Sequence, residues 1–213
     1  MQLYSFFNSS TSYRVRIALA LKGLSYAYLP VNIRVGQHHA DEYVDGINPS
    51  ASVPALVDGD FTLGQSLAIL DYLDTHYPEP RLLPAGGELR ARVLELAYLV
   101  SCDMHPVNNL RVLKYLQSEL KVSPEQKDAW YRHWIDEGMT AVERLLDRHG
   151  NGPWCFGAQP TLADVCLVPQ MANALRMGCD LSAYPRAVAV FAHASTHPAF
   201  AQAAPARQPD YTA

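Results

Sequence analysis

A run of hydroxyl side chains near the N-terminus, Ser9–Ser12, has the residue types needed to bind and activate an anion. It follows a predicted short strand, Gln2–Phe6, and precedes Tyr13–Lys22, a good helix former. The first turn of a helix leaves backbone N–H groups unpaired and carries partial positive charge, to which Arg14 and Arg16 would add. Such a place could lower the pKa of a thiol from about 8.5 toward neutrality. By spacing alone, a plain helix cap is the commoner explanation.

Two residue pairs further along the chain could bind other parts of an extended ligand. Val53-Pro54 opens a predicted strand, and a cis bond there would expose the backbone N–H and C=O of Val53. An ordinary turn proline is the alternative, since few X–Pro bonds are cis. Gln65-Ser66 opens a predicted helix, Leu67–His76, with Ser66 as its cap. This helix start suits a carboxylate, although a plain Ser cap explains the pair when it is viewed alone.

The elements that must position these groups follow a β-α-β, then β-β-α order up to about residue 80. The second strand is predicted at Tyr26–Asn32, and a hairpin with an Asp-Gly turn spans Val53–Leu63. Three prolines and two glycines in Tyr77–Gly87 cannot continue a helix and predict a linker.

Every segment after the linker is predicted to be helical. The predicted helices are Glu88–Leu120 with an interruption near Pro106, a helix from the Ser123 cap to about His149, one from the Thr161 cap to about Arg176, and Ala187–Thr196. The chain end, Ala203–Ala213, is rich in Pro, Ala and Gln and is expected to lie extended.

Length and composition exclude several classes of protein. The chain has 213 residues, 49% of them hydrophobic and 18% charged, which excludes disorder and indicates a sizeable core. A net charge of -4 excludes an overall basic protein of the kind that binds nucleic acid through its total charge. No apolar run reaches the roughly 20 residues of a membrane helix, and the first residues lack the pattern of a signal peptide. The four cysteines form no C-x-x-C pair, so we expect no metal site and no disulfide framework.

Taken together, these features resemble the cytosolic glutathione transferases, and within them the zeta class. The resemblance covers almost the whole chain and is most specific at Ser9–Leu19, which is similar to the zeta signature Ser-Ser-Cys-x-x-Arg-Val-Arg-Ile-Ala-Leu. Further matches are Asn48-Pro49, Val53-Pro54, Gln65–Ile69, Arg81–Pro84, Pro106–Leu113 and Thr161–Arg176. Thr11 stands where the signature has cysteine. It cannot form a mixed disulfide, but it can donate a hydrogen bond to a thiolate.

The resemblance implies an α/β thioredoxin-like domain over residues 1–80, a linker over 81–87 and an all-α domain over 88–213. It implies glutathione as the cofactor, no metal, a homodimer and a cytoplasmic location. The implied glutathione ligands are Ser9, Ser10 and Thr11 at the sulfur, Val53 with Pro54 at the cysteine backbone, Gln65 and Ser66 at the γ-glutamyl carboxylate, His38 or His39 near the glycyl end, and His105 and Asn109 nearby. Asp103 is a looser suggestion for the ligand's amino group, across a dimer interface, with a helix-surface charge as the alternative.

Two arginines could bind the carboxylates of a substrate. Arg176 matches the family segment whose Arg faces the substrate, and Arg111 follows Asn109-Leu110. A guanidinium matches a carboxylate in a bidentate fork, although either residue could be a solvated surface arginine. Arg14 and Arg16 are expected to be structural helix residues.

The reaction that the resemblance implies is glutathione-dependent cis–trans isomerisation of maleylpyruvate, as in bacterial gentisate breakdown. Maleylacetoacetate isomerisation is the near alternative, and sequence patterns barely separate the two. A conjugating transferase or dehalogenase acting on small α-halo acids, and a non-catalytic binding or scaffold protein, are further alternatives.

Two other groups of residues are expected to be structural. Thr161 and Asp164 have the spacing of an N-capping box and are assigned to stability. The four cysteines, Cys102, Cys155, Cys166 and Cys179, are expected to lie in the core.

Overall fold

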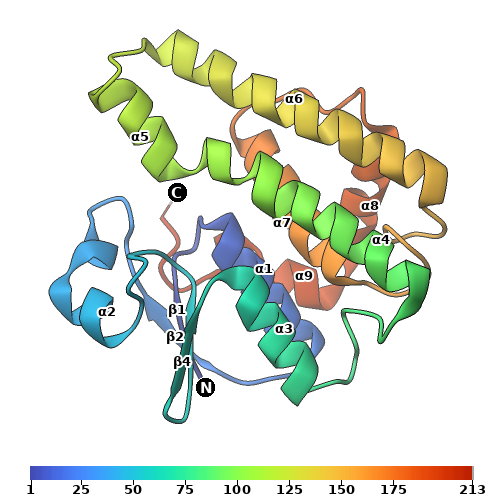
Figure 1. Cartoon of the computed structure of the whole chain (residues 1–213), viewed down its shortest axis with the longest axis horizontal. Helices are drawn as coiled ribbons and strands as arrows, with labels where there is room; N and C mark the ends of the chain where they lie inside the picture. The colour runs from blue at the N-terminus through green and yellow to red at the C-terminus, as the bar shows by residue number, and fades with distance from the viewer. Residues whose placement is uncertain (213) are drawn as a thin grey trace. The chain divides into compact units, whose positions relative to one another are not determined.

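The computed structural model describes residues 1–212, which separate into two compact units (Figure 1). The first unit comprises Met1–Leu83 together with the chain from Ser195 onward, and the second comprises Pro84–Ala194. The division after Leu83 falls within the predicted linker. The sequence assigned the C-terminal segment to the helical domain, whereas the structure places it with the first unit.

The first unit is built on a mixed four-stranded sheet with the order β2-β1-β3-β4. Strand β1 (Gln2–Ser5) pairs in parallel with β2 (Ala27–Pro30) and antiparallel with β3 (Ala55–Asp58). Strand β4 (Phe61–Gly64) pairs antiparallel with β3 across the predicted Asp-Gly turn, where Gly59 has a φ of 60°. The predicted strands and hairpin are confirmed, and β2 is shorter than expected.

Helices cover this sheet in the thioredoxin-like arrangement that the family resemblance implied. Helix α1 (Ser10–Leu21) packs against α3 (Ser66–His76) and α9 (Pro198–Ala203). Tyr13 donates to the Phe200 carbonyl at 3.1 Å, and Arg16 Nε donates to the Ala203 carbonyl at 2.9 Å, which joins α1 to α9. These bonds explain why the C-terminal segment returns to the first unit.

Two helices of the first unit were missed from the sequence. Helix α2 (Asp41–Gly46) begins without a side-chain cap, and α9 lies between the predicted helix Ala187–Thr196 and the predicted tail, where no element was expected. The tail, expected to lie extended, instead forms a 3-10 turn at Pro205–Arg207. Each of the two helices has six residues, which is too short to show a helical period. Tyr43 of α2 packs in a core cluster with Phe6, Phe7, Val31 and Val53. Neighbours distant in sequence therefore stabilise α2.

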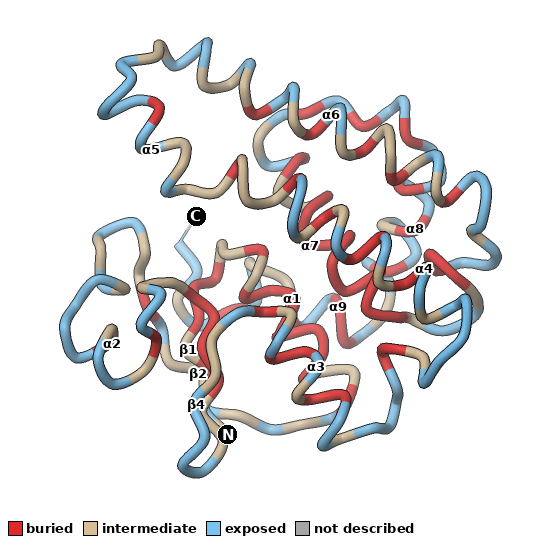
Figure 2. The backbone as a smooth tube through the Cα atoms, in the orientation of Figure 1, coloured by how far each residue is buried: buried red, intermediate tan, exposed pale blue. Residues whose placement is uncertain are grey.

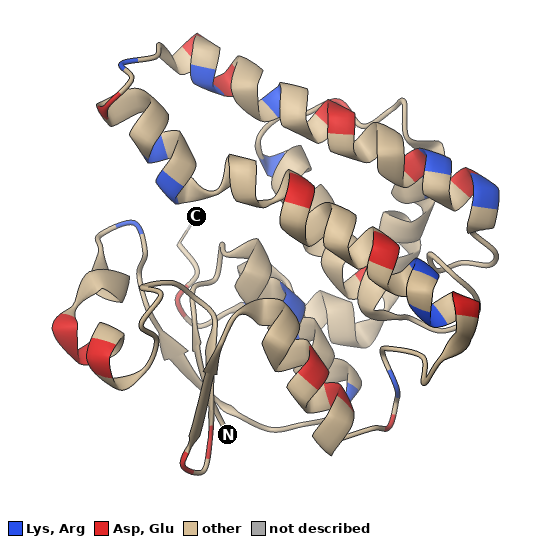
Figure 3. Cartoon of the chain, viewed as in Figure 1, with Lys and Arg blue, Asp and Glu red and all other residues tan. Residues whose placement is uncertain are grey.

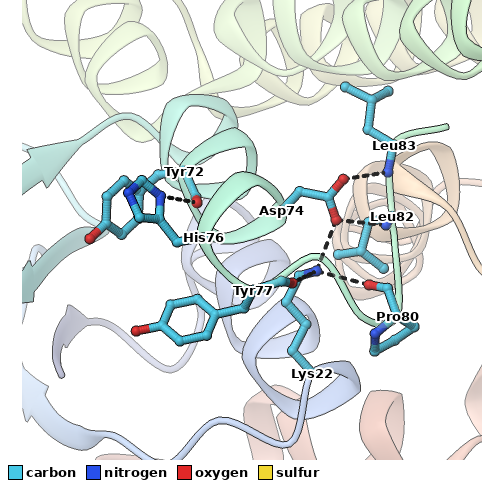
Figure 4. Close-up of polar contacts among 8 residues, drawn as sticks. All are labelled: Lys22, Tyr72, Asp74, His76, Tyr77, Pro80, Leu82 and Leu83. Atoms are coloured by element: carbon cyan, nitrogen blue, oxygen red, sulfur yellow. Dashed lines mark hydrogen bonds and ion pairs between the residues drawn. The ribbon is translucent and has the colours of Figure 1, made fainter. Parts of the chain in front are cut away.

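A buried ion pair between Lys22 and Asp74 holds residues 77–83, the last part of the Met1–Leu83 segment of the first unit (Figure 4). Lys22 Nζ lies 2.8 Å from Asp74 Oδ1 and also donates to the carbonyls of Tyr77 and Pro80. The Asp74 carboxylate accepts the N–H groups of Leu82 and Leu83 at 2.7 and 3.0 Å. Each charge has several partners, which a buried ion pair requires. The chain is therefore anchored immediately before the division between the units.

The second unit is helical, as predicted. Its helices are α4 (Gly87–Tyr98), a π-helical segment Leu99–Met104, a 3-10 turn Pro106–Asn108, α5 (Leu110–Ser118), α6 (Pro124–His149), α7 (Leu162–Arg176) and α8 (Pro185–Thr196), which runs past Ala194. The expected interruption near Pro106 and the caps at Ser123 and Thr161 are confirmed. Helix α7 is buried along most of its length and forms the centre of this unit (Figure 2). No helix within residues 1–212 is both long and apolar enough to span a membrane.

Candidate functional site

The start of α1 places three hydroxyl groups around one helix end. Ser9 is the N-cap, with extended φ and ψ of -82° and 119°, and its Oγ accepts the Ser12 N–H at 3.2 Å. The helix begins at Ser10, three residues before the predicted helical segment. Ser9 and Thr11 are half-buried and Ser10 is buried. The first turn of α1 contains no acidic residue, so its partial positive charge is not neutralised from within the turn.

A chain of hydroxyl hydrogen bonds joins α1 to the segment before β3. Thr11 Oγ1 donates to the Val53 carbonyl at 3.0 Å and lies 2.9 Å from Ser9 Oγ. Each hydroxyl has one hydrogen, and that of Thr11 is directed to Val53. Ser9 is therefore the donor in the Ser9–Thr11 bond. Thr11 acts as a bridge between two elements, a role that nothing in its local sequence indicates.

The Val53-Pro54 bond is cis, as the family resemblance implied. Val53 and Pro54 are both buried, and Pro54 immediately precedes β3. Of the two backbone groups of Val53 expected to meet a ligand, the carbonyl is already hydrogen-bonded to Thr11.

Asn48 holds the loop that leads to Val53, a role that the sequence did not assign. It is 3% exposed, its Nδ2 donates to the Ser52 carbonyl at 2.8 Å, and its Oδ1 accepts from Ser50 Oγ at 2.8 Å. A Cβ placed on Gly64 would lie 2.9 Å from Asn48 Oδ1, so this contact requires glycine. The match of Asn48-Pro49 to the zeta class was the one feature of the sequence that could have drawn attention to this residue.

The start of α3 differs from the prediction in its cap. Ser66 was expected to cap the helix, but the N-cap residue is Gln65, and Ser66 is the first helical residue. Gln65 is exposed and has a φ of 65°, in the left-handed region that few residues other than glycine adopt. Such strain is held by the surrounding structure and gathers at ligand-binding positions. Ser66 Oγ accepts from Arg14 Nη1 at 3.3 Å, which joins the first turns of α1 and α3.

Arg14 and Arg16 are structural, as expected, and are 1% and 0% exposed. Arg16 donates to Ser5 Oγ at 3.1 Å and to the carbonyls of Phe6 and Phe7 at 3.3 and 3.0 Å. Burial lowers the pKa of Arg16, and nearby tyrosines and Asp210 act in the opposite direction. Arg16 therefore fixes the backbone immediately before Ser9.

His38 and His39 lie in a 3-10 turn, Gln37–His39, between β2 and α2. Their rings are tilted by 39° to each other, with centroids 3.9 Å apart. His38 is half-buried and His39 is exposed. Their role at the glycyl end of a ligand stays a prediction.

The predicted glutathione ligands of the second unit lie around the break between α4 and α5. Asp103 is exposed within the π-helical segment Leu99–Met104, and His105 follows it. Asn109 caps α5 by accepting the Arg111 N–H at 3.2 Å, and its Nδ2 lies 3.4 Å from His105 Nε2. Single π-helical turns occur frequently at functional sites. The structure thus gives Asn109 a capping role in addition to the predicted one.

The two candidate substrate arginines lie at helix ends and are exposed. Arg176 is the last residue of α7, and its Nη2 donates to Asn173 Oδ1 at 2.7 Å. Burial raises the pKa of Tyr131 to about 12, although the positive charge of Arg176 acts to lower it. Arg111 lies in the first turn of α5, a helix that carries basic but no acidic residues between Leu110 and Ser118 (Figure 3). Both arginines are therefore exposed positive charges at helix ends.

Comparisons with known proteins place these features in a family. The family model for the glutathione S-transferase N-terminal domain matches residues 1–75. A maleylacetoacetate isomerase of Pseudomonas aeruginosa is 49% identical over 212 residues, which cover 99% of this chain and 98% of that protein. A zeta-class glutathione S-transferase of Euphorbia esula is 42% identical over 213 residues, which cover 100% of this chain and 93% of that protein. The chain belongs to the zeta class of glutathione transferases. The resemblance inferred from the sequence is confirmed.

Solved structures of zeta-class and related proteins agree over the whole chain. A holo maleylpyruvate isomerase, described as a bacterial zeta-class glutathione transferase, has a TM-score of 0.97 and 45% identity and covers 100% of both chains. A maleylacetoacetate isomerase of Anaeromyxobacter dehalogenans, solved with dicarboxyethyl glutathione and citrate, has a TM-score of 0.87 and 39% identity. The two chains are covered to 99% and 93%. The predicted fold class, a thioredoxin-like domain followed by a helical domain, is confirmed.

The cysteines of this zeta-class chain correct one expectation. Cys155, Cys166 and Cys179 are buried free thiols, as predicted, but Cys102 is exposed. Cys102 lies in the π-helical segment, whose wider turns place its residues on other faces than the 3.6-residue period of an α-helix would. Burial and the neighbouring Asp164 raise the pKa of Cys155, which keeps that thiol protonated.

Proposed function

We propose that this chain is a glutathione-dependent cis–trans isomerase that converts maleylpyruvate to fumarylpyruvate in the breakdown of aromatic compounds such as gentisate. The observation that carries the proposal is the start of α1, where Ser9 and Thr11 form a hydroxyl chain at a helix end without an acidic residue. A homodimer in the cytoplasm is part of the proposal. Free thiols at all four cysteines agree with a reducing compartment.

The first unit has polar groups that fit an extended anionic tripeptide. The first turns of α1 and α3 both lack acidic residues, and the Arg14–Ser66 hydrogen bond joins them. The N–H groups of such helix ends bind anions. In this proposal Gln65 and Ser66 bind the γ-glutamyl carboxylate, and Val53 with Pro54 binds the cysteine backbone. His38 or His39 lies at the glycyl end. The family resemblance also assigns His105, Asn109 and, more loosely, Asp103 to glutathione.

Bound glutathione supplies a thiolate that can add to the cis double bond and leave after rotation. The chain's part is to hold that sulfur as an anion. Ser10 and the N–H groups of the first turn of α1 act as donors, and Ser9 joins them by turning its hydroxyl hydrogen from Thr11 to the sulfur when glutathione binds. Thr11 donates to Val53 in this structure, so its part is to hold the α1 start against the ligand-binding loop. Donors placed in advance need little reorganisation during reaction.

Arg176 and Arg111 bind the two carboxylates of the substrate. The Arg176 guanidinium donates to Asn173 and Arg176 is exposed, so in this proposal it donates hydrogen bonds to a substrate carboxylate from the end of α7. Arg111 is held at the start of α5 by the Asn109 cap. Guanidinium–carboxylate hydrogen bonds are charge-assisted and directional, which suits a dicarboxylate.

Maleylacetoacetate is the second candidate substrate. The 49% identity to a maleylacetoacetate isomerase favours it as much as the 45% identity to a maleylpyruvate isomerase favours the first. Both substrates are maleyl keto acids and would use the same arginines.

The test compares isomerisation of the two keto acids with glutathione present in catalytic amounts. We expect turnover of maleylpyruvate without consumption of glutathione. Stoichiometric glutathione consumption with α-halo acids would instead identify a conjugating transferase or dehalogenase. Binding of glutathione without any turnover would indicate a binding protein.

Arg176→Ala tests the substrate assignment. It should raise KM for the keto acid by about tenfold or more, since hydrogen bonds between charged groups contribute roughly 1.5–3 kcal/mol, and it should leave glutathione affinity unchanged. Arg92→Ala is the matched control, because the Arg92 side chain is 43% exposed in the second unit and pairs with Glu95 three residues away at 2.6 Å. An unchanged KM in Arg176→Ala would refute the role of Arg176.

A further inference from the structure

The C-terminal tail forms two hydrogen bonds with the chain that leads into the proposed glutathione site. Asp210 Oδ2 accepts the backbone N–H of Phe7 at 3.0 Å, although 203 residues separate the two. Asp210 Oδ1 accepts from the Tyr28 hydroxyl at 2.6 Å. Both carboxylate oxygens are therefore occupied, one by the segment before α1 and one by β2. The Tyr211 ring also packs edge-on against Phe7, with centroids 5.4 Å apart.

Phe7 belongs to the turn that leads directly into Ser9, the N-cap of α1. The Ser9 N–H donates to the Phe6 carbonyl at 3.0 Å, so residues 6–9 form a tight turn immediately before the N-cap. Arg16 donates to the carbonyls of Phe6 and Phe7 from within the unit. The Phe7 peptide groups are thus held on two sides, the N–H by Asp210 and the C=O by Arg16. The orientation of Ser9 after this turn therefore depends on both hydrogen bonds to Phe7, the one from Arg16 and the one to Asp210.

The tail that carries Asp210 is itself anchored. Gln208 is 9% exposed, and its Nε2 donates to the carbonyls of Gln202 and Ala204 at 3.0 and 2.9 Å. Arg16 also holds the Ala203 carbonyl at the end of α9. The same buried guanidinium therefore connects the tail to the turn before Ser9. The sequence predicted only an extended tail and gave no sign of this connection.

We propose that Asp210 is a positioning residue for glutathione activation, acting through the Phe7 N–H to fix the Phe6–Ser9 turn and hence the Ser9 donor. This inference rests on the proposed use of glutathione at the start of α1. A hydrogen-bond donor aimed at a charged group loses much of its effect when it is displaced by about 1 Å. A turn held by one partner instead of two gives Ser9 that freedom.

Geometry and charge predict opposite results when the carboxylate is removed. Loss of a nearby negative charge, acting alone, would favour the thiolate and lower the pKa of the bound thiol. Loss of the Phe7 anchor would weaken the donors around the sulfur and raise that pKa. The direction of the change therefore separates positioning from simple electrostatics.

The experiment titrates the thiolate absorbance of bound glutathione in the full-length protein and its variants. We expect Asp210→Ala to raise the apparent pKa of the bound thiol by about one, which is about tenfold less thiolate at a given pH below it. Asp58→Ala is the matched control. Asp58 is also half-buried and accepts tyrosine hydroxyls, those of Tyr72 and Tyr77, at the far end of β3 from Val53. It should leave the thiol pKa unchanged.

Asp210→Asn tests the hydrogen bonds separately from the charge. Its amide oxygen can accept the Phe7 N–H and its NH2 group can donate to the Tyr28 hydroxyl, so the anchor is kept and only the charge is lost. A thiol pKa at or slightly below the wild-type value is therefore expected, in contrast to the increase in Asp210→Ala. An unchanged or lowered thiol pKa in Asp210→Ala would overturn the proposal, even if thermal stability fell. If Asp210→Ala does not fold, Tyr28→Phe decides. It should raise the thiol pKa in the same direction, and no change would overturn the proposal.

The result can be separated from failure of the proposed function. Wild-type protein that binds glutathione as a thiolate but does not isomerise a keto acid would refute the reaction and leave the Asp210 test intact. Wild-type protein that isomerises the keto acid, with a thiol pKa insensitive to Asp210→Ala, would refute only the positioning role.

Discussion

The starts of α1 and α7 are both built from capping residues, yet they offer different chemistry. At α7, Asp164 is fully buried and its carboxylate accepts the Thr161 N–H, the Thr161 hydroxyl and the Cys155 N–H at 2.8, 3.0 and 2.8 Å. At α1, Ser9 and Thr11 supply hydroxyls, and the first turn carries no acid. A helix start that contains its own carboxylate has its positive end neutralised from within. A start with hydroxyls alone leaves that end for a ligand.

The largest expected effect is the loss of stability in Asp164→Ala. This change leaves the buried N–H groups of Thr161 and Cys155 without their acceptor, at roughly 1–3 kcal/mol each. We expect the free energy of unfolding, measured by urea denaturation, to fall by about 3 kcal/mol. Glutathione affinity of the folded protein should stay the same. A lowered affinity at unchanged stability would show that the α7 start also serves the ligand.

Ser9→Ala should have the next largest effect, and this effect should be on activity. Removing one donor that stabilises a developing anion typically costs about 100-fold or more in rate, so kcat/KM should fall by about that factor. Thr161→Ala is the matched control, since both residues are N-caps. Both variants should lose about 1 kcal/mol of stability through the lost cap, but only Ser9→Ala should lose activity. Equal activity in the two variants would remove the distinction between the helix starts.

Thr11→Asp gives α1 the acid that it lacks and should make its start resemble that of α7. The new carboxylate would occupy the positive end of the helix and repel the glutathione anion, raising Kd for glutathione by about tenfold, or about 1.4 kcal/mol. Thr11→Asn is the control, because it has the same shape without the charge. Calorimetry of glutathione binding measures both. If the two variants bound glutathione equally well, the anion would have to bind elsewhere.

Local patterns predicted the parts of the fold that local interactions stabilise. The Ser123 and Thr161 caps, the proline at the start of α6 and the breakers before α4 act within a few residues of themselves, and the structure has them as predicted. Helices α2 and α9 were missed because each is short and packs on residues far away in the sequence. The exposure of Cys102 was missed because π-helical turns change which face a residue occupies.

The candidate site was predicted by residue type better than by role. Ser9, Thr11 and Val53 do lie together, and the Val53-Pro54 bond is cis. The donation from Thr11 to Val53 links residues 42 apart, so no local pattern could reveal it. The left-handed backbone of Gln65 was also unpredictable, because glutamine shows no preference for that conformation.

The sequence by itself determined the Ser123 and Thr161 caps, the linker, the zeta-class signature and the absence of an acid in the first turn of α1, because these depend on residues adjacent in the chain. Tertiary structure decided which hydroxyl hydrogen is directed to which acceptor, why Arg14 and Arg16 are buried, and where the tail lies. Those outcomes depend on hydrogen bonds between segments as distant as Phe7 and Asp210. Only the folded chain brings such segments together, since closing long loops is opposed by chain entropy until the packed core compensates it.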